Sequence, residues 1–180
     1  PRRVRPGDVV IINGPVGDHG MTIMCQRENL RLQGNLVSDT RPLHREVTAL
    51  IERFGEDIHC LRDLTRGGLA SVMNEIAVGS GAAIHLQENV IPVNPPVSGA
   101  CELLGLDPLY VANVGKFAIF AAPEAAEAVV EVLRAVDERN RPAIIGQVVA
   151  GDSARVVLEG PLGGSRILDL LSGEQLPRIC

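Results

Sequence analysis

The chain has 180 residues, 46% of them hydrophobic and 22% charged, which is the composition of a folded protein with room for one domain and its own core. The net charge is −5, and no Lys/Arg-rich run of the kind that neutralises a nucleic-acid backbone is present, so we expect no nucleic-acid partner. No apolar stretch is long enough to cross a bilayer and the first residues do not form a signal peptide, so we expect no membrane partner. The four widely spaced cysteines fit a reducing, cytoplasmic compartment.

The first half of the chain contains alternating strand and helix signals. Residues 9–12 are a β-rich run that ends at Asn-Gly-Pro, which predicts a strand and a turn. Residues 17–20 (Gly-Asp-His-Gly) are expected to form a loop before a helix at 21–30. A second helix is predicted over 43–54, because its apolar residues fall on one helical face. Ser38 and Asp39 are expected to be its N-caps.

The middle of the chain continues this alternation. A strand is predicted at 58–61 and a helical stripe at 69–76, with Gly79 beyond its end. A further strand is predicted at 82–86. Pro95-Pro96 then predicts the start of a helix that ends near Gly105.

The last third predicts a strand at 117–122, a helix at 123–136, and a hairpin of 143–150 and 155–158 around Gly151-Asp152. The predicted class is α+β, a mixed β-sheet with about four helices. Residues 1–172 are expected to form a single domain, in which 1–7 are linker-like, and 173–180 a C-terminal tail.

A glycine-rich turn between a strand and a helix is one candidate binding site. The two glycines, Gly67 and Gly68, allow a close approach of the backbone, and the helix N-terminus offers free N–H groups to an anion. Asp63, Thr65 and Arg66 are candidate ligands for a phosphate or a donor. The structural alternative is an N-cap and a tight turn.

Other polar residues are weaker candidates. His19 is a possible acid, base or oxyanion donor, although a lone histidine in a glycine turn is more often structural. Asn113 and Lys116 precede a strand, and Lys116 binds an anion or is a solvated charge. The spacing of the other three histidines does not indicate a metal site, so we expect no metal in this chain. Cys180 places a thiol on a terminus, which is mobile in most proteins, and its thiolate would be a nucleophile.

Taken together, several motifs resemble the HypE family of hydrogenase maturation proteins, and the resemblance runs over nearly the whole chain. The residues that carry it are Gly17-Asp18-His19-Gly20-Met21, Asp63-Leu64-Thr65-Arg66-Gly67-Gly68-Leu69, Asn74-Glu75-Ile76-Ala77, the run from Cys101 to Asn113, and the ending Leu176-Pro177-Arg178-Ile179-Cys180. The resemblance implies a fold of the aminoimidazole ribonucleotide synthetase type. It covers only the C-terminal half of that fold, so we expect the N-terminal ATP-binding half to be absent.

The resemblance also implies a reaction. A HypF-type carbamoyltransferase places a carbamoyl group on the terminal cysteine, here Cys180, and ATP with Mg²⁺ drives its dehydration to a thiocyanate. The cyano group then passes to iron on a HypC–HypD scaffold, as a cyanide ligand of [NiFe]-hydrogenase. The whole protein is expected to be a homodimer and an ATP-dependent carbamoyl dehydratase. The isolated chain is expected to be inactive and to bind no cofactor.

One position departs from the family pattern. The family has Glu where this chain has Val114. If that Glu transfers a proton, valine cannot replace it, and dehydration is expected to be slow. Two alternatives remain: this acid is dispensable for the reaction, or another carboxylate takes its place in the proton transfer.

Two other functions stay open at this point. One is a non-catalytic carrier or interaction module, which tight ATP binding by these residues alone would contradict. The other is a related ATP-dependent small-molecule synthetase or kinase of the same fold, which full activity of a Cys180→Ala variant would support.

Overall fold

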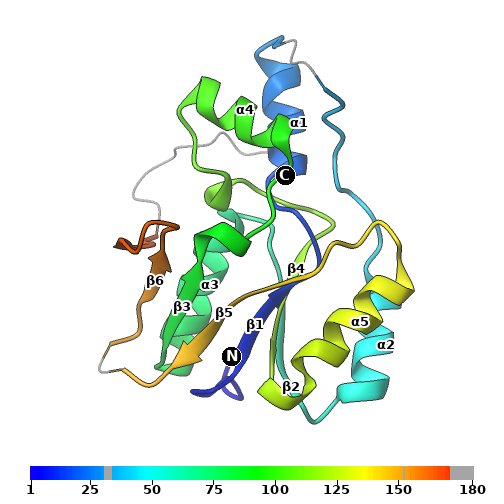
Figure 1. The fold of residues 1–180 in the computed structure, drawn as a ribbon. Helices are drawn as coiled ribbons and strands as arrows, with labels where there is room; N and C mark the ends of the chain where they lie inside the picture. Colours follow the sequence, from blue (N-terminus) through cyan, green and yellow to red (C-terminus); the bar gives the residue numbers. More distant parts are fainter. Residues whose placement is uncertain (31–33, 152, 171–180) are drawn as a thin grey trace.

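The computed structural model describes residues 1–30, 34–151 and 153–170 (Figure 1). The strands are β1 (Val9–Ile12), β2 (Ile58–Asp63), β3 (Ala83–Gln87), β4 (Phe117–Ala121), β5 (Ala143–Val149), β6 (Val156–Glu159) and β7 (Ser165–Ile167). The α-helices are α1 (Asp18–Arg27), α2 (His44–Phe54), α3 (Gly68–Ser80), α4 (Pro95–Leu104) and α5 (Ala126–Val136). Three short 3-10 helices are η1 (Glu88–Val90), η2 (Pro108–Tyr110) and η3 (Pro123–Ala125). The predicted α+β class is confirmed, with five α-helices in these ranges instead of about four.

The strands form one mixed sheet in the order β2-β4-β1-β5-β3-β6-β7. All neighbours are antiparallel except β3 and β6, which are parallel. The predicted hairpin of 143–150 and 155–158 is wrong, because β3 lies between β5 and β6. Both sides of β5 are already paired, with β1 and with β3, so no edge of β5 is free for β6.

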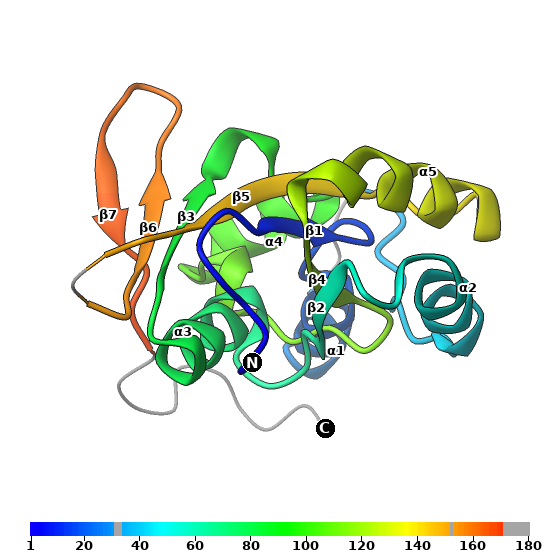
Figure 2. The ribbon, with the colours of Figure 1, turned by 90° about the horizontal axis from the view of Figure 1, so that it is seen from below.

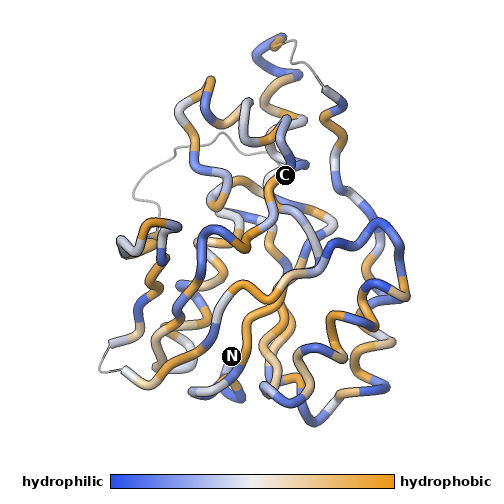
Figure 3. Tube along the Cα trace, viewed as in Figure 1, coloured by the Kyte–Doolittle hydropathy of each residue, from blue (hydrophilic) through white to orange (hydrophobic). Residues whose placement is uncertain are grey.

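The middle of the sheet is covered on both faces, which explains why its strands are apolar without alternation. Within β1, Val10 and Ile12 pack into the core that contains α3, while Ile11 between them packs into the core of α2 and α5. In Figure 2, α2 and α5 lie together and apart from α3. The hydrophobic colouring of Figure 3 is concentrated along the central strands. The core therefore consists of two apolar layers separated by the sheet.

Helices α1 and α4 pack against each other beyond one end of the sheet, where a third apolar cluster joins them (Figure 1). The predicted helix at 95–104 is confirmed, with Gly105 in the left-handed region at its C-cap. The predicted helical stripe at 69–76 lies in α3, which continues past Gly79 to Ser80 and has the left-handed Gly81 at its C-cap. Packing against the N-terminus favours glycine at position 79, since a Cβ there would lie 2.9 Å from Cβ of Pro1.

Residues 1–7 form no helix or strand, but they are attached to the domain. Val4 is buried in the α3 core, and the Gly7 N–H donates to the Val148 carbonyl. The predicted tail at 173–180, with Cys180, lies outside the described residues. None of the described helices is long and apolar enough to span a membrane.

Candidate functional site

Residues 109–116, here called the central loop, lie between the first turn of α1 and the first turn of α3. The Gly20 N–H donates to the Ala112 carbonyl at 3.0 Å, and a Cβ on Gly20 would lie 2.4 Å from Val111 Cγ1. On the other side, a Cβ on Gly68 would lie 2.6 Å from the carbonyl oxygens of both Leu109 and Val111. Both glycine motifs are therefore required by close backbone packing against the same loop.

Asn113 holds the central loop in place. It is fully buried, and its side-chain oxygen accepts the Gly17 N–H at 2.8 Å. Its Nδ2 donates to the Leu64 carbonyl at 3.1 Å and to the Val111 carbonyl at 3.0 Å. The side chain of this predicted site residue thus joins the start of α1 to the turn that precedes α3.

The Gly-Asp-His-Gly segment is not a loop, and the prediction of a helix beginning at 21 is wrong. Gly17 is the N-cap in the left-handed region, with φ of 91°, and α1 begins at Asp18. The Asp18 carboxylate accepts two hydrogen bonds from Asn94 Nδ2, at 2.8 and 3.0 Å. Burial raises the pKa of Asp18, and the hydrogen bond from Asn94 partly offsets this.

His19 lies in the first turn of α1, and one of its ring nitrogens is bonded. Nδ1 lies 2.8 Å from Ser38 Oγ, whereas Nε2 is buried without a hydrogen-bond partner among the described residues. Ser38 is therefore not an N-cap as predicted. It bridges His19 and Thr40, and α2 begins six residues later at His44, with Leu43 at its N-cap.

Asp39 is not a helix cap either, because its carboxylate reaches the central loop. Oδ1 accepts the Val114 N–H at 3.1 Å, and Oδ2 lies 3.4 Å from Lys116 Nζ. The side chains of Asp39 and Lys116 are only 2% and 10% exposed, so Lys116 is not the solvated charge that was one reading of the sequence. Burial lowers the pKa of Lys116, while the negative charges of Asp39 and Asp18 raise it.

Arg41 adds a second buried cation beside this pair. Its guanidinium contacts Asp137 at 2.7 Å and the buried Glu46 at 3.2 Å. Oppositely charged side chains thus surround each cation, which reduces the cost of burying these charges.

A pocket of about 340 Å³ adjoins the Asp39–Lys116 pair. Its lining is Asp18, Asn35, Val37, Ser38, Asp39, Thr40, Arg41, Asn94, Lys116 and Arg139. Sequence reasoning found only Lys116 of these as a site residue. Asp18 was part of the noted Gly-Asp-His-Gly motif. The contacts of Asp39 with Val114 and of Arg41 with Gly115 join residues more than 70 positions apart in sequence, so they give no local signal.

The turn between β2 and α3 forms a separate polar cluster. Asp63 is the last residue of β2, and it pairs with Arg62 and accepts the Thr65 hydroxyl at 2.7 Å. Burial alone would raise the pKa of Asp63, but the hydrogen bond from Thr65 and the charge of Arg62 lower it overall. Gly67 and Gly68 are both left-handed, with φ of 68° and 60°, and Arg66 is exposed.

The predicted site residues therefore fall into two groups on opposite sides of the central loop. His19 and Lys116 lie toward α1 and the 38–41 segment, and residues 63–68 lie at the start of α3. Backbone hydrogen bonds between Leu64 and both Lys116 and Asn113 join the two groups.

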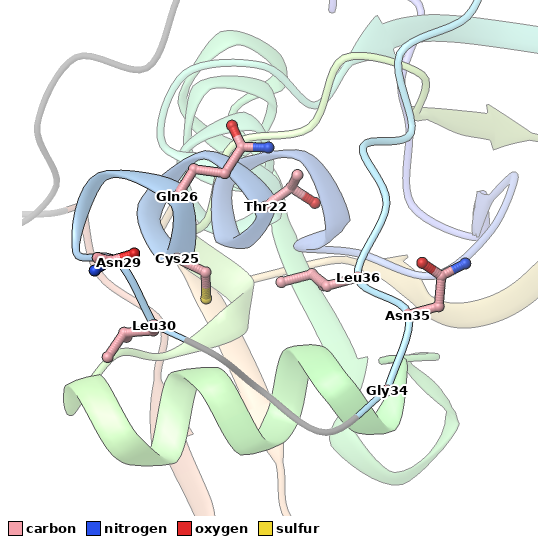
Figure 4. Close-up of a pocket in the computed structure, with 8 residues that line it drawn as sticks. All are labelled: Thr22, Cys25, Gln26, Asn29, Leu30, Gly34, Asn35 and Leu36. Carbon is pink, nitrogen blue, oxygen red and sulfur yellow. The ribbon is translucent and has the colours of Figure 1, made fainter.

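A second pocket, of about 510 Å³, lies beside the C-terminal part of α1 (Figure 4). In this view the Cys25 thiol points between Leu30 and Leu36. Cys25 and Cys101 are buried, whereas Cys60 is partly exposed. Burial raises the pKa of Cys101 to about 11. Within the described ranges, no three His, Cys, Asp or Glu side chains are grouped so that they could hold a metal ion.

Comparison with known proteins gives a consistent result. Residues 5–159 match the family described as AIR synthase related protein, C-terminal domain. The chain is 50% identical over 99% of its length to the carbamoyl dehydratase HypE of Azotobacter vinelandii, and 51% identical over 99% to that of Bradyrhizobium diazoefficiens. It covers 52% and 51% of those proteins, so it spans about half the length of the curated relatives it matches.

Solved structures agree with this likeness. A hydrogenase maturation protein HypE superposes with a TM-score of 0.93 at 46% identity, over 99% of this chain and 57% of the other. A HypE in complex with ATP gives 0.92 at 44% identity, over 99% and 54%. A HypE–HypF complex gives 0.88 at 39% identity, over 94% and 55%.

Proposed function

This chain belongs to the family of AIR synthase related C-terminal domains, and from that premise we propose that it is the substrate-carrying part of an ATP-dependent carbamoyl dehydratase. The observation that carries the proposal is the match to carbamoyl dehydratases along 99% of the chain at about 50% identity. The related fold of a HypE bound to ATP supports ATP as the energy source. We therefore infer a role in hydrogenase maturation.

The carrier is the thiol of Cys180. A carbamoyl group is bound to this sulfur, its oxygen takes a phosphoryl group from ATP, and loss of phosphate leaves a thiocyanate. Phosphorylation matters because the oxygen of a carbamoyl group is a poor leaving group. A substrate attached to a tail visits separate active sites without dissociating, which raises its effective concentration at each. The cyano group then serves as a cyanide ligand of [NiFe]-hydrogenase.

The partners follow from the same chemistry. A HypF-type carbamoyltransferase loads Cys180, which the solved complex of a relative with HypF supports. A HypC–HypD scaffold receives the cyano group, and the full-length protein is a homodimer in the cytoplasm. Within the described ranges no three His, Cys, Asp or Glu side chains are grouped as metal ligands. We assign ATP and Mg²⁺ to an N-terminal half like the one that the relatives possess.

The glycine turn and the central loop have defined roles in this proposal. Asp63, Thr65, Arg66, Gly67 and Gly68 receive the tail or a phosphate at the start of α3. Arg66 is the exposed cation of this group. Asn113 keeps this turn and the start of α1 in register through its three hydrogen bonds.

Intact-mass analysis tests the carrier role. The full-length protein is incubated with the carbamoyltransferase, carbamoyl phosphate and ATP, and the mass of the protein is followed with time. We expect the gain of one carbamoyl group, followed by loss of one water, with both changes mapped to Cys180. The matched control is Cys180→Ala, which should gain nothing. A wild-type protein that gains no mass beside a competent relative refutes the proposal.

A further inference from the structure

The buried Asp39–Lys116 ion pair lies in the wall of the 340 Å³ pocket. Oδ1 of Asp39 is occupied by the Val114 N–H, but Oδ2 is buried and accepts no hydrogen bond within the described part of the chain. Lys116 Nζ is its charge partner at 3.4 Å, a distance that is long for a charged hydrogen bond. A buried acceptor without a well-placed donor is costly, so a bound N–H donor would stabilise this oxygen.

We propose that Asp39 and Lys116 bind the carbamoyl group itself, with Lys116 donating to its oxygen and Asp39 Oδ2 accepting its N–H. This assignment rests on the proposed function. A primary carbamoyl group carries an acceptor oxygen beside N–H donors, and the pair offers a donor and an acceptor 3.4 Å apart. A phosphate group is an anion and would be repelled by Asp39. An ammonium group would be repelled by Lys116.

The local charges suit a neutral group. Asp39 and Lys116 sum to zero charge, and the other charges that face Lys116 are Asp18 and Arg41, which also cancel. Arg139 also lines the pocket, and its guanidinium is paired with Asp137, so a neutral carbamoyl group meets a nearly balanced set of charges. Gly115 keeps the carboxylate in position, because a Cβ at that residue would lie 1.9 Å from the Asp39 carbonyl oxygen.

This placement gives Asp39 a chemical role. As the carbamoyl oxygen attacks the γ-phosphorus of ATP and ADP leaves, the C–N bond becomes double and one N–H proton passes to Asp39. Asp39 then releases that proton to solvent. In the second step the C–O bond breaks, phosphate leaves with the electron pair, and Asp39 accepts the remaining N–H proton as the C≡N bond forms. The thiocarbamate and ATP thus give thiocyanate, ADP, phosphate and protons.

The backbone of residue 114 holds the Asp39 carboxylate at this point of the central loop. Val114 has no ionisable group, yet its backbone N–H holds Asp39 directly beside it. A carboxylate is therefore present at this point of the central loop, although it comes from the 38–41 segment. Lys116 stabilises the negative charge that develops on this oxygen when the C–O bond breaks in the second step.

The test uses the full-length protein and separates loading from dehydration. Asp39→Asn and Lys116→Met are loaded by the carbamoyltransferase, mixed with ATP, and followed by single-turnover thiocyanate formation. We expect normal loading, and dehydration slowed by about 10²–10⁴-fold for Asp39→Asn, the usual effect of losing a general base. Asp8→Asn is the matched control. Asp8 is an equally buried carboxylate at the opposite end of β1, so this variant should dehydrate at the wild-type rate.

A rescue experiment distinguishes chemistry from folding. Dehydration by Asp39→Ala should recover when formate is added and not when chloride is added at equal ionic strength. Wild-type protein that loads but forms no thiocyanate overturns the proposed function. Wild-type turnover with equal turnover by Asp39→Asn overturns only the role of the pair. Parallel loss of loading and dehydration, without formate rescue, also overturns that role and makes Asp39 structural.

Discussion

Replacing Asn113 with alanine tests whether this buried amide holds the two halves of the site together. The Gly17 N–H would lose its acceptor, which costs roughly 1–3 kcal/mol in the interior. The two hydrogen bonds donated by Nδ2 would also be lost, at roughly 0.5–1.5 kcal/mol each. The Leu64 carbonyl keeps the Asn113 backbone N–H at 3.1 Å and is not left without a donor. The free energy of unfolding should therefore fall by about 2–6 kcal/mol.

Urea unfolding followed by far-UV circular dichroism measures this change, since the chain has no Trp to report by fluorescence. Asn89→Ala is the control, because Asn89 is exposed in η1 and its replacement should change stability by less than about 0.5 kcal/mol. Turnover by Asn113→Ala should decline with the folded fraction. A loss below about 1 kcal/mol would refute the view that this amide joins α1 to the α3 turn.

Four further changes test other parts of the structure. Gly68→Ala should destabilise more than Gly105→Ala in urea unfolding, since both glycines are left-handed but only Gly68 meets backbone atoms; equal losses would contradict the close packing. Arg66→Ala should reduce turnover while the free energy of unfolding changes by less than about 0.5 kcal/mol; proportional losses of turnover and stability would make Arg66 structural. In native protein at pH 8, Cys101 should be alkylated by iodoacetamide more slowly than Cys60 in peptide mass maps. Because its folded pKa of about 11 exceeds the ordinary value of 9.0, the stability from the protonated thiol is complete below pH 9 and lost as pH rises toward 11. Val114→Glu should dehydrate at the wild-type rate if Asp39 accepts the protons, whereas a gain of about 10²–10⁴ would return that role to position 114, as the sequence alone predicts.

The elements that were predicted correctly have strong local signals. The helix at 95–104 has two prolines at its start and a glycine after its end, and both act through the backbone of adjacent residues. The strand at 117–122 is apolar at every position, and the structure buries it on both faces. Family likeness was also visible in the sequence, because it lies in contiguous motifs.

The errors occurred where a residue has several possible partners. Ser38 and Asp39 are good N-caps by type, yet their side chains bond to His19 and to the Val114 N–H. The glycines around Asp18 are typical of a turn, so the sequence pattern predicts too late a start for α1. Gly20 is instead small because Val111 and Ala112 approach it closely.

By itself the sequence determined the class of fold, the family and the glycine motifs, since each depends on residues that are neighbours in the chain. Only the tertiary structure decided that β3 separates β5 from β6, because that order depends on which strand edges remain unpaired. It also decided that Asp39 meets Lys116, 77 positions later, in the wall of one pocket. Such a pair is stable only when folding removes both charges from water together, and that burial is a property of the packed domain and not of either local sequence.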